Sequence, residues 1–338
     1  MSKNLVITGA SGFAGSHILQ EFDNNIERDY KLIAACRNRN TLPTKYQDVA
    51  IVGDLRDKTY VDKITKKADI ICHAAAWAEL NGKNKNSKVK FLNPTLQLID
   101  SALKNGVKRF IFLSAITSNP IIKQNLHSKL PLYKIWAHYN NVIKIERYLE
   151  DISKKGIEVI ILRAGLFTGK NYALGILPIL LPRLKTHLVP WIENGKTSLP
   201  LIDGQDLGLA FRLSTIANVE SNYHTIDIVG KDTPTVEKVF TYLHKKHNYP
   251  LPHFSVSFNI AYIFARFMRF VHKFIPSDPL IVPSIVLLLE ETYANNEKAK
   301  SILNYEAKIN WRDSIDMQIS EFNVRQEKNM RMNKYEID

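Results

Sequence analysis

The chain has 338 residues, of which 46 are Lys or Arg and 33 are Asp or Glu, giving a formal net charge of +13. This length allows one large α/β domain with a satellite lobe, or two domains. A hydrophobic content of 45% and a charged content of 23% are ordinary for a globular protein with a sizeable core, and they exclude a disordered chain. The positive charge favours anionic ligands, but the lysines are scattered and no recognition motif accompanies them, so we expect no nucleic-acid binding.

The two cysteines and the apolar segments bear on location. Cys36 and Cys72 lie in apolar runs, which predicts buried thiols and argues against a disulfide framework or a metal site. The opening sequence MSKNLVITG leads directly into a strand and does not resemble a secretory signal. The apolar stretch 254–274 carries cations that a membrane-spanning helix rarely tolerates. We therefore expect a cytoplasmic protein.

The first 165 residues alternate between predicted strands and predicted helices. The strands are continuous apolar runs, as parallel strands covered on both faces require. They are expected at 3–9, 30–36, 48–54, 68–76, 108–114 and 156–165. Helical spacing separates them, for example at 16–25 and 93–106. This alternation predicts an α/β fold built on a Rossmann-type, doubly wound parallel sheet.

The pattern changes after residue 165. Prolines interrupt 178–200, and a strand is expected at 224–230. Helices are expected at 206–217, 235–247, 257–274, 281–293 and 311–329. We predict a dinucleotide-binding domain at 1–165, to which the chain returns around 200–230; a smaller, mixed C-terminal substrate lobe at 166–322; and a polar tail at 323–338.

A glycine-rich loop follows the first strand. In TGASGFAG, residues 8–15, the glycines Gly9, Gly12 and Gly15 have the spacing G-x-x-G-x-x-G. The first turns the chain, the second lets the main chain approach a pyrophosphate, and the third lets helix and strand pack closely. The helix that follows supplies free N–H groups and a positive dipole end. The context of strand, loop and helix predicts dinucleotide binding.

The end of the second strand indicates which dinucleotide is bound. An acidic residue there would accept the ribose hydroxyls of NAD, whereas this chain has ACRNRN, with Arg37 and Arg39. A guanidinium pairs with the 2′-phosphate of NADP. We predict NADP, with NAD as the second choice; the alternative is that both arginines are ordinary surface charge.

The sequence resembles the extended short-chain dehydrogenase/reductases of the NAD-dependent epimerase/dehydratase type, and especially their 3β-hydroxysteroid dehydrogenase and dihydroflavonol-reductase branches. The resemblance covers most of the chain. It rests on TGASGFAG (8–15), GDLRD (53–57), HAAA (73–76), RFIFLSAITS (109–118), LRAGLFTGK (162–170), LIDGQDLGLA (201–210) and EKAKSILNYEAKINWRDSI (297–315).

The resemblance implies a cofactor site. Its residues would be Gly9, Ser11, Gly12, Phe13, Gly15, Arg37, Asp54, Leu55, His73, Ala74, Ala75, Arg163 and Gly165. It also implies hydride transfer at a hydroxyl or carbonyl of a small or steroid-like substrate. In such enzymes a tyrosine is the general acid/base, a lysine four residues later holds the nicotinamide ribose, and a serine or threonine orients the substrate. A homodimer through helices 88–105 and 133–155 is expected by the same analogy.

The stretch PLYKIWAHYNNVIKIERYLE, residues 131–150, contains no Tyr-x-x-x-Lys. Glu146 resembles the glutamate that commonly follows the family's lysine by four residues, which places Val142 at the lysine position and His138 at the tyrosine position. Tyr139 and Tyr133 have no lysine four residues later. In the strand at 109–118, alanine stands where the substrate-orienting hydroxyl is usual.

Three interpretations stay open. In the first, His138 or Tyr139 is the acid/base, and Ser114 or Thr117 orients the substrate. In the second, the chain binds a cofactor without turnover, as a scaffold or sensor. In the third, cofactor positioning and second-lobe residues carry the chemistry. We predict an enzyme with an atypical active site and no metal.

The segment 257–274 is a basic amphipathic helix by its pattern. Arg266, Arg269 and Lys273 have helical spacing and are expected to form one basic face. The favoured interpretation is a lid over the substrate pocket with solvated arginines. The alternative is peripheral contact with an anionic membrane surface.

Overall fold

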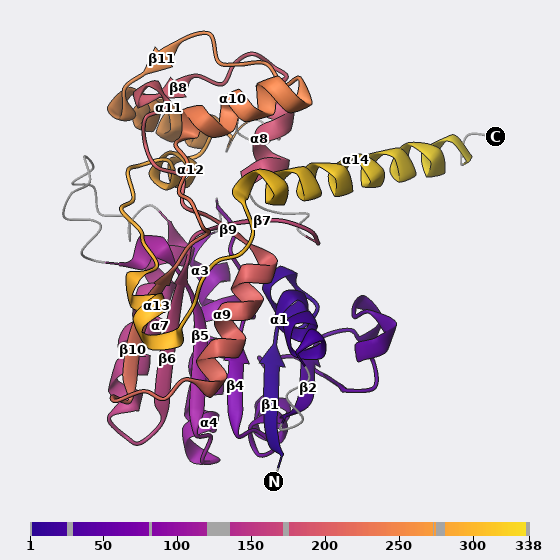
Figure 1. The fold of residues 1–338 in the computed structure, drawn as a ribbon, viewed down its shortest axis with the longest axis vertical. Coiled ribbons are helices and arrows are strands. Elements are labelled where there is room, and N and C mark those ends of the chain that lie inside the picture. Colours follow the sequence, from indigo (N-terminus) through magenta and orange to yellow (C-terminus); the bar gives the residue numbers. More distant parts are fainter. Residues whose placement is uncertain are drawn as a thin grey trace.

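A seven-stranded parallel sheet forms the centre of the molecule (Figure 1). The computed structural model describes residues 2–25, 30–80, 83–119, 136–171, 176–272, 274 and 281–335, with side chains as far as residue 324. The strand order is β10-β6-β5-β4-β1-β2-β3, and neighbouring strands are parallel. The strands are β1 (Lys3–Thr8), β2 (Tyr30–Cys36), β3 (Ala50–Val52), β4 (Ile70–His73), β5 (Arg109–Ala115), β6 (Glu158–Ala164) and β10 (Tyr223–Ile228). The predicted Rossmann-type fold is confirmed.

Helices cover both faces of this sheet, which explains the continuous apolar runs. Each strand sends alternate side chains to opposite faces. Leu5 and Ile7 pack in one buried cluster, whereas Val6 packs in the other. The first face is covered by α1 (Phe13–Asn24), α9 (Gly204–Ile216) and α13 (Glu297–Leu303). The second is covered by α2 (Lys58–Thr65), α4 (Asn93–Lys104) and α7 (Ala137–Ser153).

Short elements connect these parts. They are the 3₁₀ turns at Arg39–Thr41, Thr44–Tyr46, Ile116–Ser118 and Glu193–Gly195, the helix α3 (Asn84–Ser87), and a π-helical turn at Lys88–Leu92 that leads into α4. Both cysteines are buried free thiols, as predicted.

The second lobe lies beyond the carboxyl ends of the strands, at the end of the molecule opposite the N-terminus (Figure 1). It contains α8 (Ile176–Leu184), α10 (Val236–His247), α11 (Phe258–Val271), α12 (Pro283–Leu288) and the paired strands β8 (Trp191–Ile192) and β11 (Ser255–Val256). A second strand pair, β7 (Leu166–Thr168) and β9 (Leu201–Asp203), links it to the sheet. Helix α14 (Trp311–Tyr335) then extends outward.

Two element boundaries differ from those expected. Helix α14 continues to Tyr335, through most of the segment predicted as a polar tail. Helix α8 forms despite Pro182 in its interior, because Leu177, Leu181 and Leu184 bury a helical stripe in the lobe core. None of the helices in the described part of the chain has the length and apolar character needed to cross a membrane.

Candidate functional site

The glycine loop lies where the strand order reverses. Strands β2 and β3 continue to one side of β1, and β4, β5 and β6 to the other. The carboxyl ends of β1 and β4 therefore flank the topological switch point, where ligands of doubly wound sheets bind. Gly9, after β1, has φ +68° there. A Cβ on Gly9 would lie 2.7 Å from the Cα of Ala75, so the loops after β1 and β4 touch through main chain only.

The other two glycines of the loop have different requirements. A Cβ on Gly15 would lie 2.2 Å from the carbonyl oxygen of Gly9, so this glycine permits the close packing of α1 on β1. A Cβ on Gly12 would approach only that same oxygen, at 3.2 Å. Gly12 is an exposed N-cap, no side chain caps it, and the first turn of α1 contains no acidic residue. The N-terminus of α1 is thus left without a side-chain cap or a nearby carboxylate, and its first main-chain N–H groups could bind an anion.

The remaining predicted loop residues lie close to Gly12 in the sequence or follow the neighbouring strand β4. Ser11 is exposed, and Phe13 is partly buried with its ring stacked on Phe167 at a centroid distance of 5.3 Å. Ala74 and Ala75 are partly buried. These positions could hold the pyrophosphate and the ribose next to it.

Arginines gather at the carboxyl ends of β2 and β3. Arg37 and Arg39 are exposed just after β2. Asp54 follows β3 and is chelated by Arg56, with Nε donating to Oδ1 at 3.0 Å and Nη2 to Oδ2 at 2.6 Å. This pairing, assisted by Arg37, lowers the pKa of Asp54 to about 2. Because Arg56 compensates its charge, Asp54 would not repel a phosphate bound beside Arg37.

The side chain of His73 is committed to the core. Its Nδ1 hydrogen-bonds Thr8 Oγ1 at 2.7 Å, its Nε2 hydrogen-bonds Thr95 Oγ1 at 3.0 Å, and its ring stacks on Phe112. Burial lowers the pKa of His73 to about 3. Any contact of His73 with a cofactor would therefore be made by its main chain.

Glu146 is the centre of a buried ionic cluster on the α7 face of the sheet. Arg163 Nη2 donates to Glu146 Oε2 at 2.7 Å, and Ser118 Oγ donates to Oε1 at 2.5 Å. Ser114 also donates its hydroxyl proton to Oε1. Ser114, Arg163 and Asp227 are in register across β5, β6 and β10. Glu146 thus already binds the side chains of Ser114 and Arg163, two residues that were predicted to contact the substrate or the cofactor.

The two positions of the expected acid–base pair are both buried. Val142 is 1% exposed and packs with Ile145 and Leu149 against the sheet. His138 is 9% exposed, and its ring packs against those of Phe91 and Trp136, at centroid distances of 4.9 and 5.6 Å. The helix face that carries them is core, as its spacing indicates. No ammonium group occupies the position of the family's lysine.

Comparison with known proteins agrees with this architecture. The model of the NAD dependent epimerase/dehydratase family matches residues 5–224. The chain belongs to this family. A sterol-4-alpha-carboxylate 3-dehydrogenase (decarboxylating) of Dictyostelium discoideum is 23% identical, over 93% of this chain and 99% of that protein.

Solved structures share the fold. The UDP-glucose 4-epimerase of Thermotoga maritima, solved with UDP-glucose, has a TM-score of 0.68 at 17% identity and covers 96% of this chain and 99% of its own. The UDP-glucuronic acid 4-epimerase of Bacillus cereus, solved with NAD, has a TM-score of 0.69 at 16% identity and covers 95% and 99%. The predicted extended short-chain type is confirmed, and the family is enzymatic.

Three further positions of the family pattern were predicted to act. Tyr139 is buried in an apolar cluster that joins α7 to α11 and α12. Thr117 is partly buried, and its hydroxyl has no hydrogen-bond partner among the described residues. Gly165 lies after β6, where a Cβ would be 2.4 Å from the carbonyl oxygen of Pro200. Tyr133 lies outside the described residues.

Burial also fixes the protonation of His138. It lowers the pKa from 6.5 to about 4, against a smaller opposite effect of the Trp77 main chain, so the ring is neutral at pH 7. Its Nδ1 has no hydrogen-bond partner among the described residues. A neutral imidazole with an uncommitted nitrogen can accept a hydrogen bond from a substrate hydroxyl.

We expect His138 to make the stability of the fold depend on pH. The unfolded chain takes up the proton at pH 6.5 and the folded chain only near pH 4, so stability falls as pH falls between these values. The contribution is at most about 1.4 kcal/mol per pH unit. In urea titrations from pH 7 to 4.5, His138→Gln should show a shallower fall of the unfolding free energy than the wild type. Equal slopes would contradict the burial of a neutral imidazole.

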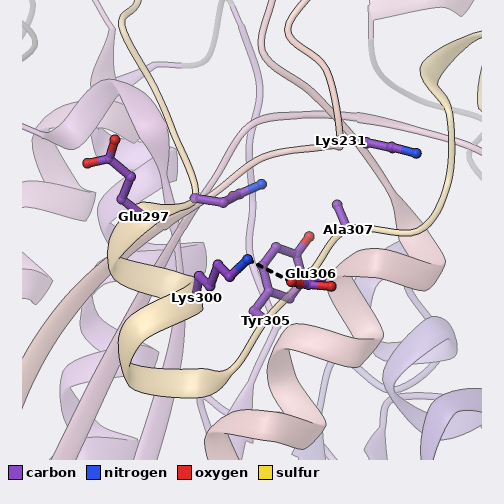
Figure 2. A pocket seen from close by; sticks show the side chains of 7 residues that line it. Lys231, Glu297, Lys300, Tyr305, Glu306 and Ala307 are labelled. Carbon is purple, nitrogen blue, oxygen red and sulfur yellow. Dashed lines mark ion pairs between the residues drawn. The ribbon is translucent and has the colours of Figure 1, made fainter.

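A surface depression lies elsewhere, beside the edge strand β10 (Figure 2). It measures about 440 Å³ and is lined by Lys231, Asn296, Glu297, Lys300, Tyr305, Glu306 and Ala307. Lys300 and Glu306 form an ion pair at 2.9 Å, and the hydroxyl of Tyr305 donates to the carbonyl of Val229. None of the predicted site residues lines it, so we assign it no part in the chemistry.

Proposed function

We propose that the chain is an NADP-dependent oxidoreductase or epimerase with an atypical active site, acting on a hydroxyl or carbonyl of a small or sterol-like molecule. The observation that carries the proposal is the contrast within the glycine loop. A Cβ on Gly9 or Gly15 would come within 2.7 Å of main-chain atoms, whereas one on Gly12 would meet only the Gly9 carbonyl oxygen, at 3.2 Å, and no side chain caps the helix there. Family membership supplies the reaction class.

The residues of this chain would divide the work as follows. The bound nicotinamide supplies or accepts the hydride. The main chain of the loop at Gly12 and the N-terminus of α1 bind the pyrophosphate. Arg37 and Arg39 bind the 2′-phosphate, and Arg56 keeps Asp54 neutralised beside them.

The proton-handling group is proposed to be His138. The register set by Glu146 assigns it the tyrosine's position on α7, and its buried Nδ1, without a partner among the described residues, would accept the proton of a substrate hydroxyl. Because Ser114 donates to Glu146, Thr117 is the better candidate for orienting the substrate oxygen. Tyr139, which lies under the second lobe, is assigned a packing role.

A second candidate function rests on Val142. With a buried valine in the lysine's position, that position lacks the charge that holds the ribose and lowers the acid's pKa. A cofactor-binding scaffold or sensor without turnover is consistent with that loss. The two functions differ in whether hydride leaves the bound cofactor.

The substrate class is drawn from relatives. The Dictyostelium protein is named for a sterol carboxylate, and the structural relatives for UDP-sugars. Both match nearly end to end, and the higher identity of the former, 23% against 17%, favours a sterol-like substrate over a sugar nucleotide. A homodimer through α4 and α7 stays a prediction, as does a cytoplasmic location, which suits two free thiols.

The cofactor assignment is tested by thermal shift. At equal concentrations, NADPH should raise the melting temperature by about 5 °C or more when it exceeds its Kd a hundredfold, whereas NADH should raise it by less. Arg37→Asp with Arg39→Asp should remove the NADPH advantage, because two phosphate partners become repulsive. Lys63→Asp with Lys67→Asp, the same charge change at two exposed residues before β4, is the control. An equal or larger shift with NADH in the wild type would refute the assignment.

A further inference from the structure

Helix α11 presents a row of large apolar side chains to solvent. Ile263 is 67% exposed, Ile260 59% and Phe267 58%. Phe270 and Phe264 are 57% and 44% exposed. With about 100° per residue, these five side chains fall within an arc of about 120°. A monomeric protein seldom exposes so many large apolar groups on one helix face without a binding role.

The opposite face of α11 already has its partner. Phe258, Ala261, Tyr262 and Ala265 are buried and pack on α12 with Val286 and Leu287. The exposed arc is therefore a second apolar face. Of the arginines expected to be solvated, Arg266 is exposed and Arg269 is partly buried. Lys273 lies outside the described residues.

A cation borders the apolar face, and the surrounding sequence is basic. Arg266 is exposed and lies about 40° beyond Phe270 on the helical wheel. From Val236 to His272 the sequence has five Lys or Arg and a single acidic residue, Glu237. Aromatic and aliphatic side chains flanked by cations are the composition of helices that lie in the interface of an anionic membrane.

The placement of α11 suits such contact. Figure 1 shows α11 in the second lobe, at the end of the molecule farthest from the N-terminus, with α12 between it and the sheet. A bilayer could reach the helix without displacing the sheet. Because the helix is too short to cross a membrane, contact would be peripheral.

We propose that the apolar face of α11, centred on Ile263 and Phe267, docks the second lobe on an anionic lipid surface. The side chains enter the boundary between headgroups and acyl chains, and Arg266 pairs with lipid phosphates. Charge complementarity favours this occupant over a second copy of the chain, because two copies of this basic region would repel each other. The proposal does not depend on hydride chemistry at the cofactor site.

Vesicle flotation tests the proposal. The full chain should float with phosphatidylcholine vesicles containing about 30% phosphatidylserine and much less with pure phosphatidylcholine. Ile263→Ser with Phe267→Ser should lower partitioning by about a hundredfold, since two large apolar side chains no longer enter the lipid. Arg266→Glu should lower it about tenfold, because the change reverses a charge near the surface. Ile216→Ser, at an exposed isoleucine ending α9, should bind as the wild type does.

Three results would overturn the proposal. One is a wild type that does not float with anionic vesicles. Another is equal loss in Ile216→Ser and in the double variant. The third is a wild-type dimer, measured by light scattering, that the double variant converts to monomer without any vesicle binding, which would make the face an interface between copies. NADPH binding, measured alongside, should be unchanged in the double variant and shows that its fold is intact.

Discussion

Gly12→Asp is expected to weaken NADPH binding by more than a hundredfold while leaving the fold intact. Gly12 has ordinary backbone angles, φ −82° and ψ 178°, and it is the N-cap of α1. Aspartate is a favourable N-cap, which offsets the tight 3.2 Å contact of its Cβ with the Gly9 carbonyl oxygen, so the free protein should melt within a few degrees of the wild type. The added carboxylate would occupy the phosphate position and repel it. Titration calorimetry with NADPH, together with a melting curve, measures both effects.

Two other glycines serve as controls. Gly15→Ala should unfold the protein or lower its melting temperature severely, because the new Cβ would lie 2.2 Å from the Gly9 carbonyl oxygen. Gly106→Asp adds the same carboxylate where nothing lies within 4 Å, at φ +71°, and should bind NADPH normally after a modest loss of stability. Unchanged affinity in Gly12→Asp would contradict the assignment of the loop.

Neutralising Glu146 is expected to lower the free energy of unfolding by several kcal/mol, about the cost of breaking a buried ion pair. Glu146→Gln leaves the Arg163 guanidinium buried without its carboxylate partner, which typically costs about 3–5 kcal/mol. Asp227, near Arg163, can recover part of this through its charge. Chemical denaturation followed by circular dichroism measures the change.

A double variant separates the stability contributed by the Glu146–Arg163 pair from that contributed by each side chain alone. Arg163→Met in the Glu146→Gln background removes the uncompensated charge, so the double variant should lose less stability than the sum of the single variants. Asp151→Asn, which breaks the exposed pair with Lys154 on the same helix, should leave stability unchanged within error. Strict additivity of Glu146→Gln and Arg163→Met would mean that the two side chains act independently.

The sheet was predictable because its strands are covered on both faces. Val6, Ile71 and Phe112 pack in one cluster, and Ile7, Cys72 and Ile111 pack in the other, so each strand reads as an unbroken apolar run. The glycine loop was equally predictable from the sequence. Gly9 and Gly15 are imposed by main-chain contacts that no other residue allows. At these two positions, the glycines of the motif are also the residues that close packing requires.

The catalytic region was only partly predictable, because its contacts join distant strands. Glu146 was identified as a register mark on α7, but its partners Ser114, Ser118 and Arg163 come from β5, the turn after it, and β6. Only the strand register brings Ser114 and Arg163 side by side. The sequence offered one clue. Each of these two apolar strands carries a polar residue one position before its end, Ser114 in β5 and Arg163 in β6.

The outward face of α11 was missed for a related reason. Its spacing gives two apolar faces, one through Phe258 and Tyr262 and one through Ile263 and Phe267. Periodicity alone does not say which face meets the lobe core. The small residues Ala261 and Ala265 allow close approach, and they mark the face that packs on α12.

Transfer of deuterium from C4-labelled NADPH to a ketone tests most directly whether this chain performs hydride chemistry without a Tyr-x-x-x-Lys pair. Ketosteroids, keto-sugar nucleotides and flavonoid-like ketones are the substrates to screen, with mass spectrometry of the alcohol as readout. We expect label in a steroid product with the wild type and with Tyr139→Phe. His138→Ala should lose it by about a hundredfold or more, the usual scale of an acid–base group. Tight NADPH binding with no label in any product would contradict the account and leave a cofactor-binding scaffold.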